Sequence, residues 1–166
     1  MLSFLSTSAK PCQVGFVVKN VDDAVKHYHE RFGVGGWQIY TYGPPLLSYM
    51  TRRGKPCSYK TRIALSNFSE TRIELIQQLE GDTVYQEFID KHGYGIHHLG
   101  IYVADIRAAI AEAEAAGISV TMEGAGFGLD GDGYFAYLDT EELLGTTYEL
   151  IQRPLRRHEP EAVYPL

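Results

Sequence analysis

The chain repeats part of its own sequence, and this repetition limits how it can fold. Residues 71–77, with the sequence TRIELIQ, return at residues 146–152 as TTYELIQ, with five of the seven residues identical. Glu74 in the first copy corresponds to Glu149 in the second. Because a repeat at a long, fixed offset is typical of a duplicated structural unit, we expect the two halves of the chain to fold alike.

A second repeated segment lies upstream of each copy. Residues 13–18 align without a gap on residues 98–103, so that Gln13 corresponds to His98. In residues 13–18, one face of the strand carries Val14, Phe16 and Val18 and the other carries Gln13, Gly15 and Val17. This alternation is typical of a half-buried strand. Each half is therefore predicted to begin with a strand and to close with the strand that contains the repeated heptapeptide.

Helices and further strands are predicted between the two repeated strands of each half. Apolar residues at helical spacing that end at a glycine predict a helix after each opening strand, and a third helix links the halves. The loop of residues 44–58 is expected to hold at most one short strand. The first predicted helix is capped by Asn20 or Asp22 and ends at Gly33, and the other predicted helices are residues 83–91 and 106–116. The predicted strands are residues 13–18, 37–42, 61–67, 71–77, 98–103, 120–123, 134–139 and 147–152.

The repeat brings four polar residues to equivalent strand positions: Gln13, Glu74, His98 and Glu149. Two carboxylates held together inside a sheet repel each other unless a cation compensates their charge. One nitrogen and three oxygen donors suit a divalent ion such as Zn, Co, Mn, Ni or Mg, and they exclude a thiolate site. These four residues are thus the candidate ligands of one divalent metal ion.

Strand alternation also makes predictions about the neighbours of these ligands. His97 is expected on the face opposite to His98. Gly15 and Gly100 follow Gln13 and His98 by two residues, so they share the ligand face, where the missing side chains leave room for a ligand above the metal.

The fold predicted from this organisation is α+β, with two tandem βαβββ modules that form a cupped mixed sheet around one metal site. The modules follow each other in the chain with a linking helix between them, and a tail containing three prolines lies along the surface. The predicted boundaries are a lead segment at 1–12, the first module at 13–80, the linking helix at 81–95, the second module at 96–153 and the tail at 154–166.

Composition and charge exclude several classes of function. The net charge of −6 leaves no broad basic surface, which argues against a nucleic-acid partner. No apolar run is long enough for a membrane span, and the first nine residues lack the features of a secretory signal. Cys12 and Cys57 form no metal or disulfide motif. We expect a cytoplasmic protein.

The glycines of residues 124–133 resemble two kinds of ligand-binding loop, and neither pattern is complete. A dinucleotide-binding loop needs a strand before the glycines and a helix after them, whereas here a strand follows. Asp130 and Asp132 resemble part of a calcium loop, which lacks its remaining ligands. The segment is therefore predicted to be a hairpin or mobile flap.

Paired βαβββ modules with these four polar residues resemble the vicinal oxygen chelate superfamily, which includes glyoxalases, bleomycin resistance proteins and dioxygenases. The resemblance covers about residues 13–153. It implies a cupped sheet around one divalent ion, open metal positions for a small-molecule substrate with adjacent oxygens, and a homodimer.

Two subfamilies are similar to this chain. The set Gln13, Glu74, His98 and Glu149 resembles that of eukaryotic-type glyoxalase I, but the glutathione contacts of that enzyme are replaced by Val17, Tyr94 and Gln78. The run GIHH at residues 95–98 and the linking helix resemble methylmalonyl-CoA epimerase, although that family has His at the position of Gln13.

Both resemblances imply the same chemistry, in which the metal stabilises an enediolate while Glu149 or Glu74 takes a proton from the carbon next to a carbonyl. The implied activity is that of an isomerase, epimerase or lyase, with an acyl thioester as one candidate substrate. The alternative is a metal-free binding protein in which both glutamates are only polar strand residues. Six aromatic residues either line an apolar pocket or pack as core, namely Tyr40, Tyr42, Tyr49, Phe127, Tyr134 and Phe135.

Overall fold

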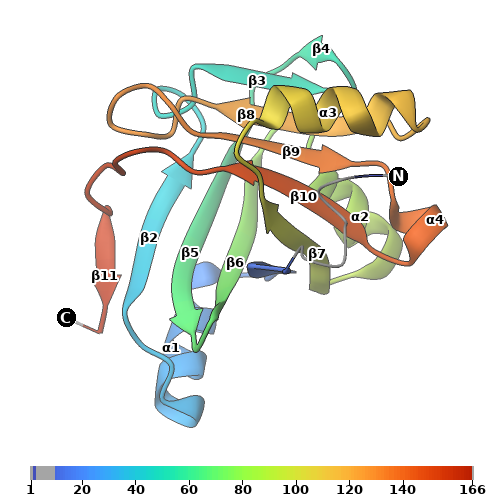
Figure 1. The fold of residues 1–166 in the computed structure, drawn as a ribbon. Helices are drawn as coiled ribbons and strands as arrows, with labels where there is room; N and C mark the ends of the chain where they lie inside the picture. The colour runs from blue at the N-terminus through green and yellow to red at the C-terminus, as the bar shows by residue number, and fades with distance from the viewer. Residues whose placement is uncertain (1, 3–9, 166) are drawn as a thin grey trace.

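The described residues form one curled sheet of eleven strands, with helices on its outside and at its edge (Figure 1). The computed structural model describes residue 2 and residues 10–165, so most of the predicted lead segment lies outside the described residues. Parallel and antiparallel neighbours both occur in the sheet. The predicted α+β class, with a cupped mixed sheet, is confirmed.

The strands follow the order β11-β2-β5-β6-β1-β7-β10-β9-β8-β3-β4 across the sheet. Their bounds are β1 Gln13–Val17, β2 Trp37–Tyr42, β3 Tyr49–Arg52, β4 Lys55–Pro56, β5 Lys60–Phe68, β6 Thr71–Glu80, β7 Gly95–Tyr102, β8 Val120–Ala125, β9 Tyr134–Leu138, β10 Thr147–Gln152 and β11 Ala162–Tyr164. The helices are α1 Val21–Phe32, α2 Val84–His92, α3 Ile106–Ala115 and α4 Glu141–Leu144. No helix among the described residues is long and apolar enough to cross a membrane.

The two repeated opening strands, β1 and β7, lie antiparallel at the centre of the sheet. Each runs parallel to the closing strand of its own half, β1 beside β6 and β7 beside β10. The register is the same in both halves, because Gly15 lies opposite Glu74 and Gly100 lies opposite Glu149. Equivalent residues of the repeat therefore surround the middle of the sheet.

The last glutamine of each repeated heptapeptide joins the closing strand to the helix of its own half. Gln77 accepts a hydrogen bond at its side-chain oxygen from the backbone N–H of Val21, at 3.0 Å. Gln152 accepts the equivalent bond from Ile106 at 2.9 Å. Because the first N–H groups of a helix have no partner within the helix, these bonds fix where α1 and α3 begin.

Two equivalent N-cap residues offer a test of this duplicated construction. Asn20 and Asp105 each accept a hydrogen bond from the third residue of the following helix, at 3.0 Å. Replacing either with alanine should lower the free energy of unfolding by about 1 kcal/mol. Urea unfolding measures this loss, and Asn67→Ala, at an exposed position in β5, is the control that should change stability by less than about 0.5 kcal/mol.

Three apolar clusters hold the sheet and the helices together. Helix α1 packs on the outer face of the first half around Trp37, and α3 packs on the second half around Leu138. The third cluster draws residues from both halves and fills the concave side, where the Tyr42 ring stacks on Phe127 at 5.4 Å. Of the six aromatic residues singled out in the sequence, Tyr40, Tyr42, Phe127 and Phe135 belong to this cluster, so they pack as core.

The structure corrects the prediction at three connections. The stretch of residues 44–58 contains two strands, β3 and β4, and β3 pairs with β8 of the second half, so it extends the far edge of the sheet. The tail forms strand β11, which pairs with β2 and becomes one edge of the sheet. The proline-rich sequence did not indicate a strand there. A short helix, α4, precedes β10.

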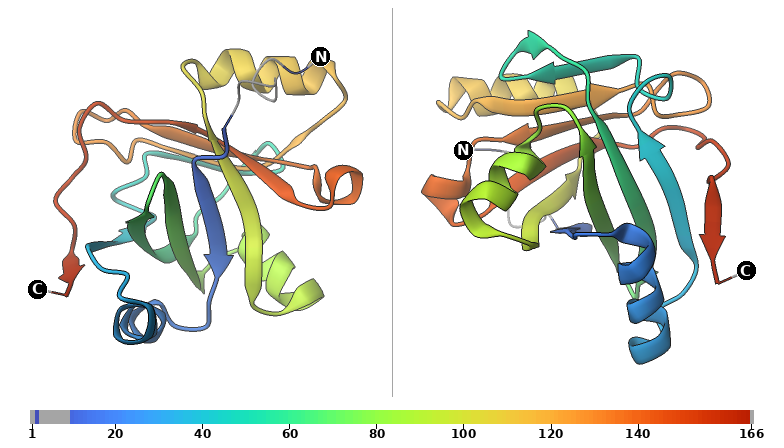
Figure 2. Two further views of the ribbon diagram at one scale, coloured as in Figure 1. Left: turned by 60° about the horizontal axis from the view of Figure 1, so that its bottom comes forward. Right: turned by 180° about the vertical axis from the view of Figure 1, so that it is seen from behind.

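Residues 126–133 connect the antiparallel strands β8 and β9, so the predicted hairpin is confirmed. This loop is also tied to the tail. The backbone N–H of Leu129 donates to the carbonyl of Arg156 at 2.9 Å, and Gly128 forms a β-bridge with Arg157. The tail therefore stays at the surface, where it crosses the hairpin and continues toward β2 (Figure 2).

Candidate metal centre

The structure brings the four predicted ligands together on the concave face. The side-chain nitrogen of Gln13 lies 3.0 Å from Oε2 of Glu74 and 2.9 Å from Oε2 of Glu149. His98 Nε2 lies 3.3 and 3.2 Å from the same two oxygens. All four side chains are buried, with relative exposures between 0% and 8%. Side chains from β1, β6, β7 and β10 thus meet at one point, as the repeat predicts.

The spacing of these atoms fits a divalent ion. Two ligand atoms at right angles on an ion with bonds of about 2.1 Å lie about 3.0 Å apart. Glu74, His98 and Glu149 each offer one ligand atom, and these atoms lie within 4.8 Å of one another. Gln13 now donates to both carboxylates, and a half-turn of its amide would present the oxygen as the fourth ligand.

The charges in the cluster also fit a cation. Burial lowers the pKa of His98, but Glu149 and Glu74 outweigh it and raise that pKa to about 9. Burial raises the pKa of Glu149, and the neighbouring His98 acts in the opposite direction, but the pKa stays above its usual value. Without a metal, the two carboxylates therefore draw a proton onto the imidazole. A divalent ion would replace that proton and neutralise both carboxylates.

The two glycines of the repeat make room for the ligands themselves. A Cβ atom on Gly15 would lie 1.9 Å from Cε1 of His98, so the imidazole occupies the space where a side chain would be. A Cβ on Gly100 would lie 2.9 Å from Cβ of Gln13. The predicted space for a bound ligand above these glycines is therefore filled by His98 and Gln13, each lying over the glycine of the other half.

His97 lies on the same side of the sheet as His98, and the predicted opposite orientation is wrong. The pairing of β1 with β7 shifts register, because Gly15 lies opposite His98 and the next residue, Phe16, lies opposite Ile96. His97 is the extra residue of this β-bulge, and a bulge breaks the alternation of faces. Both imidazoles pack on the ring of Tyr137, at 5.6 and 5.1 Å.

His97 supports His98 from behind. Nδ1 of His97 lies 3.0 Å from Nδ1 of His98, on the side of that ring that faces away from the carboxylates. Burial, followed by the charge of His98, holds the pKa of His97 well below its usual value. Since His97 is neutral, its Nδ1 can accept the proton that His98 Nδ1 carries, which turns Nε2 of His98 toward the metal position.

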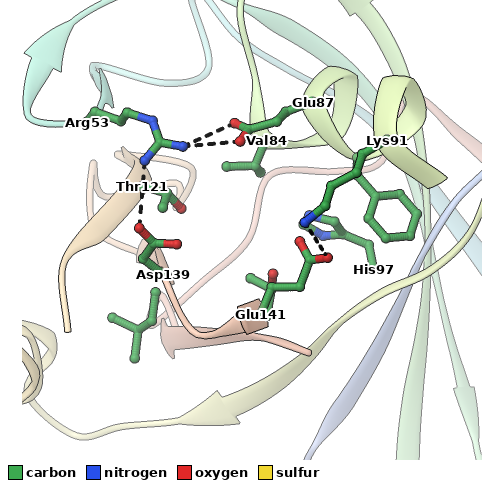
Figure 3. Close-up of a pocket in the computed structure, with 11 residues that line it drawn as sticks. Arg53, Val84, Glu87, Lys91, His97, Thr121, Asp139 and Glu141 are labelled. Carbon is green, nitrogen blue, oxygen red and sulfur yellow. Dashed lines mark hydrogen bonds and ion pairs between the residues drawn. The ribbon is translucent and has the colours of Figure 1, made fainter. Parts of the chain in front are cut away.

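The other side of His97 borders a small cavity of about 50 Å³ under α2 (Figure 3). Charged residues surround it, with Lys91 paired to Glu141 at 3.0 Å and Arg53 paired to Glu87 at 3.1 Å. The cavity is too small for an organic ligand. His97 therefore separates the buried ligand cluster from a polar rim.

Replacing His97 with leucine should weaken metal binding by about 10 to 100-fold, because the ligand His98 would lose the group that orients its ring. Competition of the purified protein with a chromogenic zinc chelator measures the affinity. The control is His92→Gln at an exposed histidine that pairs with Glu141. Equal affinity of His97→Leu and the unmodified protein would show that His97 does not position His98.

Comparison with known sequences identifies one family. The sequence model of the Glyoxalase/Bleomycin resistance protein/Dioxygenase superfamily matches residues 12–137, which is most of the chain. No curated protein sequence matches it.

Solved structures share the fold at low sequence identity. Methylmalonyl-CoA epimerase from Mycobacterium tuberculosis is 24% identical with a TM-score of 0.56, over 86% of this chain and 85% of that one. A variant of methylmalonyl-CoA epimerase from Streptomyces coelicolor, in complex with 2-nitronate-propionyl-CoA, is 17% identical with a TM-score of 0.62, over 90% and 97% of the two chains. A hypothetical protein from Bacillus halodurans is 23% identical with a TM-score of 0.60, over 92% and 99%.

Proposed function

Because the chain belongs to the Glyoxalase/Bleomycin resistance protein/Dioxygenase superfamily, we propose that it is a divalent-metal-dependent isomerase, epimerase or lyase. It acts by removing a proton from the carbon next to a carbonyl. One observation carries this proposal: four donors from distant parts of the chain converge with separations of 2.9 to 3.3 Å between neighbours. The epimerase activity named for two structures of similar fold agrees with it.

Gln13, Glu74, His98 and Glu149 would hold the ion. A divalent ion bound there acts as a Lewis acid and stabilises negative charge on a substrate oxygen by several kcal/mol. Zn, Co, Mn, Ni and Mg all suit three oxygen donors and one nitrogen donor. His97 keeps the imidazole of His98 oriented, and the buried aromatic residues of the concave side exclude water around the cluster.

Glu149 or Glu74 is the proposed base. Each carboxylate lies beside Gln13 and His98, so each would help to hold the ion and is placed to take the proton from a substrate bound there. A general base of this kind contributes about 10² to 10⁴ in rate. An acyl thioester is the substrate class we propose first, because similar folds are solved with methylmalonyl-CoA and 2-nitronate-propionyl-CoA. A homodimer and a cytoplasmic location remain predictions.

Solvent deuterium exchange tests the proposed reaction. The metal-loaded protein should exchange the proton next to the carbonyl of methylmalonyl-CoA or of a 2-oxo acid, followed by NMR in deuterated buffer. Exchange by Glu149→Gln or Glu74→Gln, normalised to bound metal, should fall by about 10² to 10⁴. Elemental analysis of the unmodified protein separates the enzyme from a metal-free binding protein. Less than one ion per chain after metal loading, or unchanged exchange in both variants, contradicts the proposal.

A further inference from the structure

We propose that a cavity beside the ligand cluster, lined by Arg72, Arg153 and Arg157, is an anion-binding subsite. It would hold a phosphate or carboxylate arm of the substrate while the reacting oxygens face the cluster. The cavity has a volume of about 240 Å³, and Gln38 and Asn67 also line it. We call it the arginine pocket. The inference deepens the proposed function and rests on it for the other end of the substrate.

Strand register places the arginine pocket next to the ligand cluster. Arg72 lies opposite Gln13 and precedes Glu74 by two residues, so its side chain emerges on the same face about 7 Å further along β6. Arg153 follows Glu149 by four residues, just beyond the end of β10, about 13 Å along the chain. The start of β1 lies at the same end of the strands as the beginning of β6 and the ends of β7 and β10 (Figure 2, left).

Two of the arginines share one aromatic ring. The guanidinium of Arg72 lies 5.9 Å from the centre of the Tyr102 ring, and that of Arg153 lies 5.1 Å from it. Cation–π contact stabilises each guanidinium, but it also gathers two like charges at one residue. Such a pair repels unless an anion lies nearby.

None of the three arginines forms an ion pair with a carboxylate of the described residues. Other arginines in this acidic chain do, since Arg52, Arg53 and Arg62 each pair with an aspartate or a glutamate. The protein has 21 acidic and 15 basic residues, yet three arginines line this one cavity and none of them is paired with a carboxylate among the described residues. Guanidinium groups bind phosphate and carboxylate oxygens through paired hydrogen bonds.

Arg157 is held in place although it belongs to the tail. Its Nη1 donates to the hydroxyl of Tyr42 at 3.0 Å, and its guanidinium lies 5.3 Å from the centre of the Phe127 ring. Its backbone bridges to Gly128 of the hairpin. The residue is also within electrostatic range of Glu74. Arg157 therefore lies between the arginine pocket and the ligand cluster. Because its side chain is already held in place, it loses little conformational entropy when an anion binds.

The charge and the position of the arginine pocket define the class of ligand. Three guanidinium groups match a phosphate dianion or a dicarboxylate better than a single carboxylate. The distances along β6 and β10 require several bonds between this anionic arm and the carbon that loses its proton. A phosphorylated or dicarboxylic acyl compound with two adjacent oxygens meets both requirements.

Calorimetric titration of the metal-free protein with inorganic phosphate and with malonate tests the arginine pocket separately from the metal. Both anions should bind the unmodified protein, and the tighter one identifies the arm as phosphoryl or dicarboxylate. Arg72→Gln and Arg153→Gln should each weaken that binding by at least about tenfold, since each removes charged hydrogen bonds. The matched control is Arg156→Gln, which removes an exposed arginine that pairs with Asp130 and does not line the pocket.

Three results would overturn the inference: no binding of either anion by the unmodified protein, unchanged binding by Arg72→Gln and Arg153→Gln, or an equal loss in Arg156→Gln. Zinc titration of the same proteins keeps the two proposals apart. Zinc binding without anion binding removes the arginine pocket and leaves the proposed function standing. Anion binding that depends on Arg72 and Arg153, in a protein that binds no zinc, supports the pocket and removes the proposed function.

Discussion

Glu149→Gln should lower the affinity of the protein for zinc by at least about 100-fold. The free energy of binding zinc at a structural site is about 10 to 16 kcal/mol. Divided among four ligands, this is about 3 kcal/mol for each ligand, which corresponds to roughly 100-fold in affinity. Glu149 supplies an oxygen that lies 3.2 Å from His98 Nε2 and 2.9 Å from the amide of Gln13. Glutamine keeps the size of the side chain and removes its charge. Competition with a chelator of known affinity measures the loss.

Glu123→Gln is the matched control for this substitution. Glu123 is another buried glutamate, but it lies on β8 and accepts hydrogen bonds from Thr51, at 2.7 Å, and from Tyr134. Its replacement should leave zinc affinity within a factor of two or three. Unchanged affinity in both Glu149→Gln and Glu74→Gln would mean that zinc binds elsewhere or that neither carboxylate is a ligand.

Gly15→Ala should disrupt the cluster although no ligand is replaced. The added Cβ would lie 1.9 Å from the imidazole of His98, whose ring is buried and held by Tyr137 and His97. Either the ring or the strand must move, so we expect the free energy of unfolding to fall by about 1 to 3 kcal/mol. Zinc affinity should fall by at least about tenfold, because a ligand is displaced from its position. Urea unfolding and zinc competition measure the two effects.

Gly95→Ala controls for the loss of a glycine. Gly95 lies on β7 itself, and a Cβ there would meet no atom within 4 Å. It should leave both stability and zinc affinity nearly unchanged. If Gly15→Ala behaves like Gly95→Ala, the contact between Gly15 and His98 does not hold the imidazole in place.

The ligand cluster could be predicted from sequence because it is symmetric. Gln13 and His98 begin the two copies of the opening strand, and Glu74 and Glu149 occupy one position of the repeated heptapeptide. Duplication of the fold then brings matching positions to the same axis, so the alignment of the chain with itself is sufficient to find them. The α+β class and most strands follow from the same periodic pattern.

Features that break the symmetry could not be found in this way. The bulge that turns His97 inward depends on how β1 and β7 pair, and alternation within β7 alone gives the opposite orientation. Strand β3 pairs on one side with β8, which belongs to the other half of the chain. Local sequence patterns carry no signal for either pairing, because both depend on contacts between segments far apart in the chain.

The arginine pocket is asymmetric as well. Arg72 corresponds to Thr147 in the second copy of the repeat, and Arg153 corresponds to Gln78 in the first. Arg157 lies in the tail, beyond the repeat. A substrate with one anionic arm is itself asymmetric, so residues that bind this arm should appear in only one half. Positions at which the copies differ on the shared concave face were the signal that could have identified Arg72 and Arg153.

X-ray absorption spectroscopy of the protein loaded with one equivalent of zinc tests the metal centre most directly. We predict a first shell of oxygen and nitrogen neighbours at about 2.0 to 2.1 Å, with the multiple-scattering signature of a single imidazole and no sulfur at about 2.3 Å. Glu149→Gln, loaded in the same way, should lose this spectrum. A spectrum with sulfur neighbours, with several imidazoles, or identical in Glu149→Gln would contradict a centre built from Gln13, Glu74, His98 and Glu149.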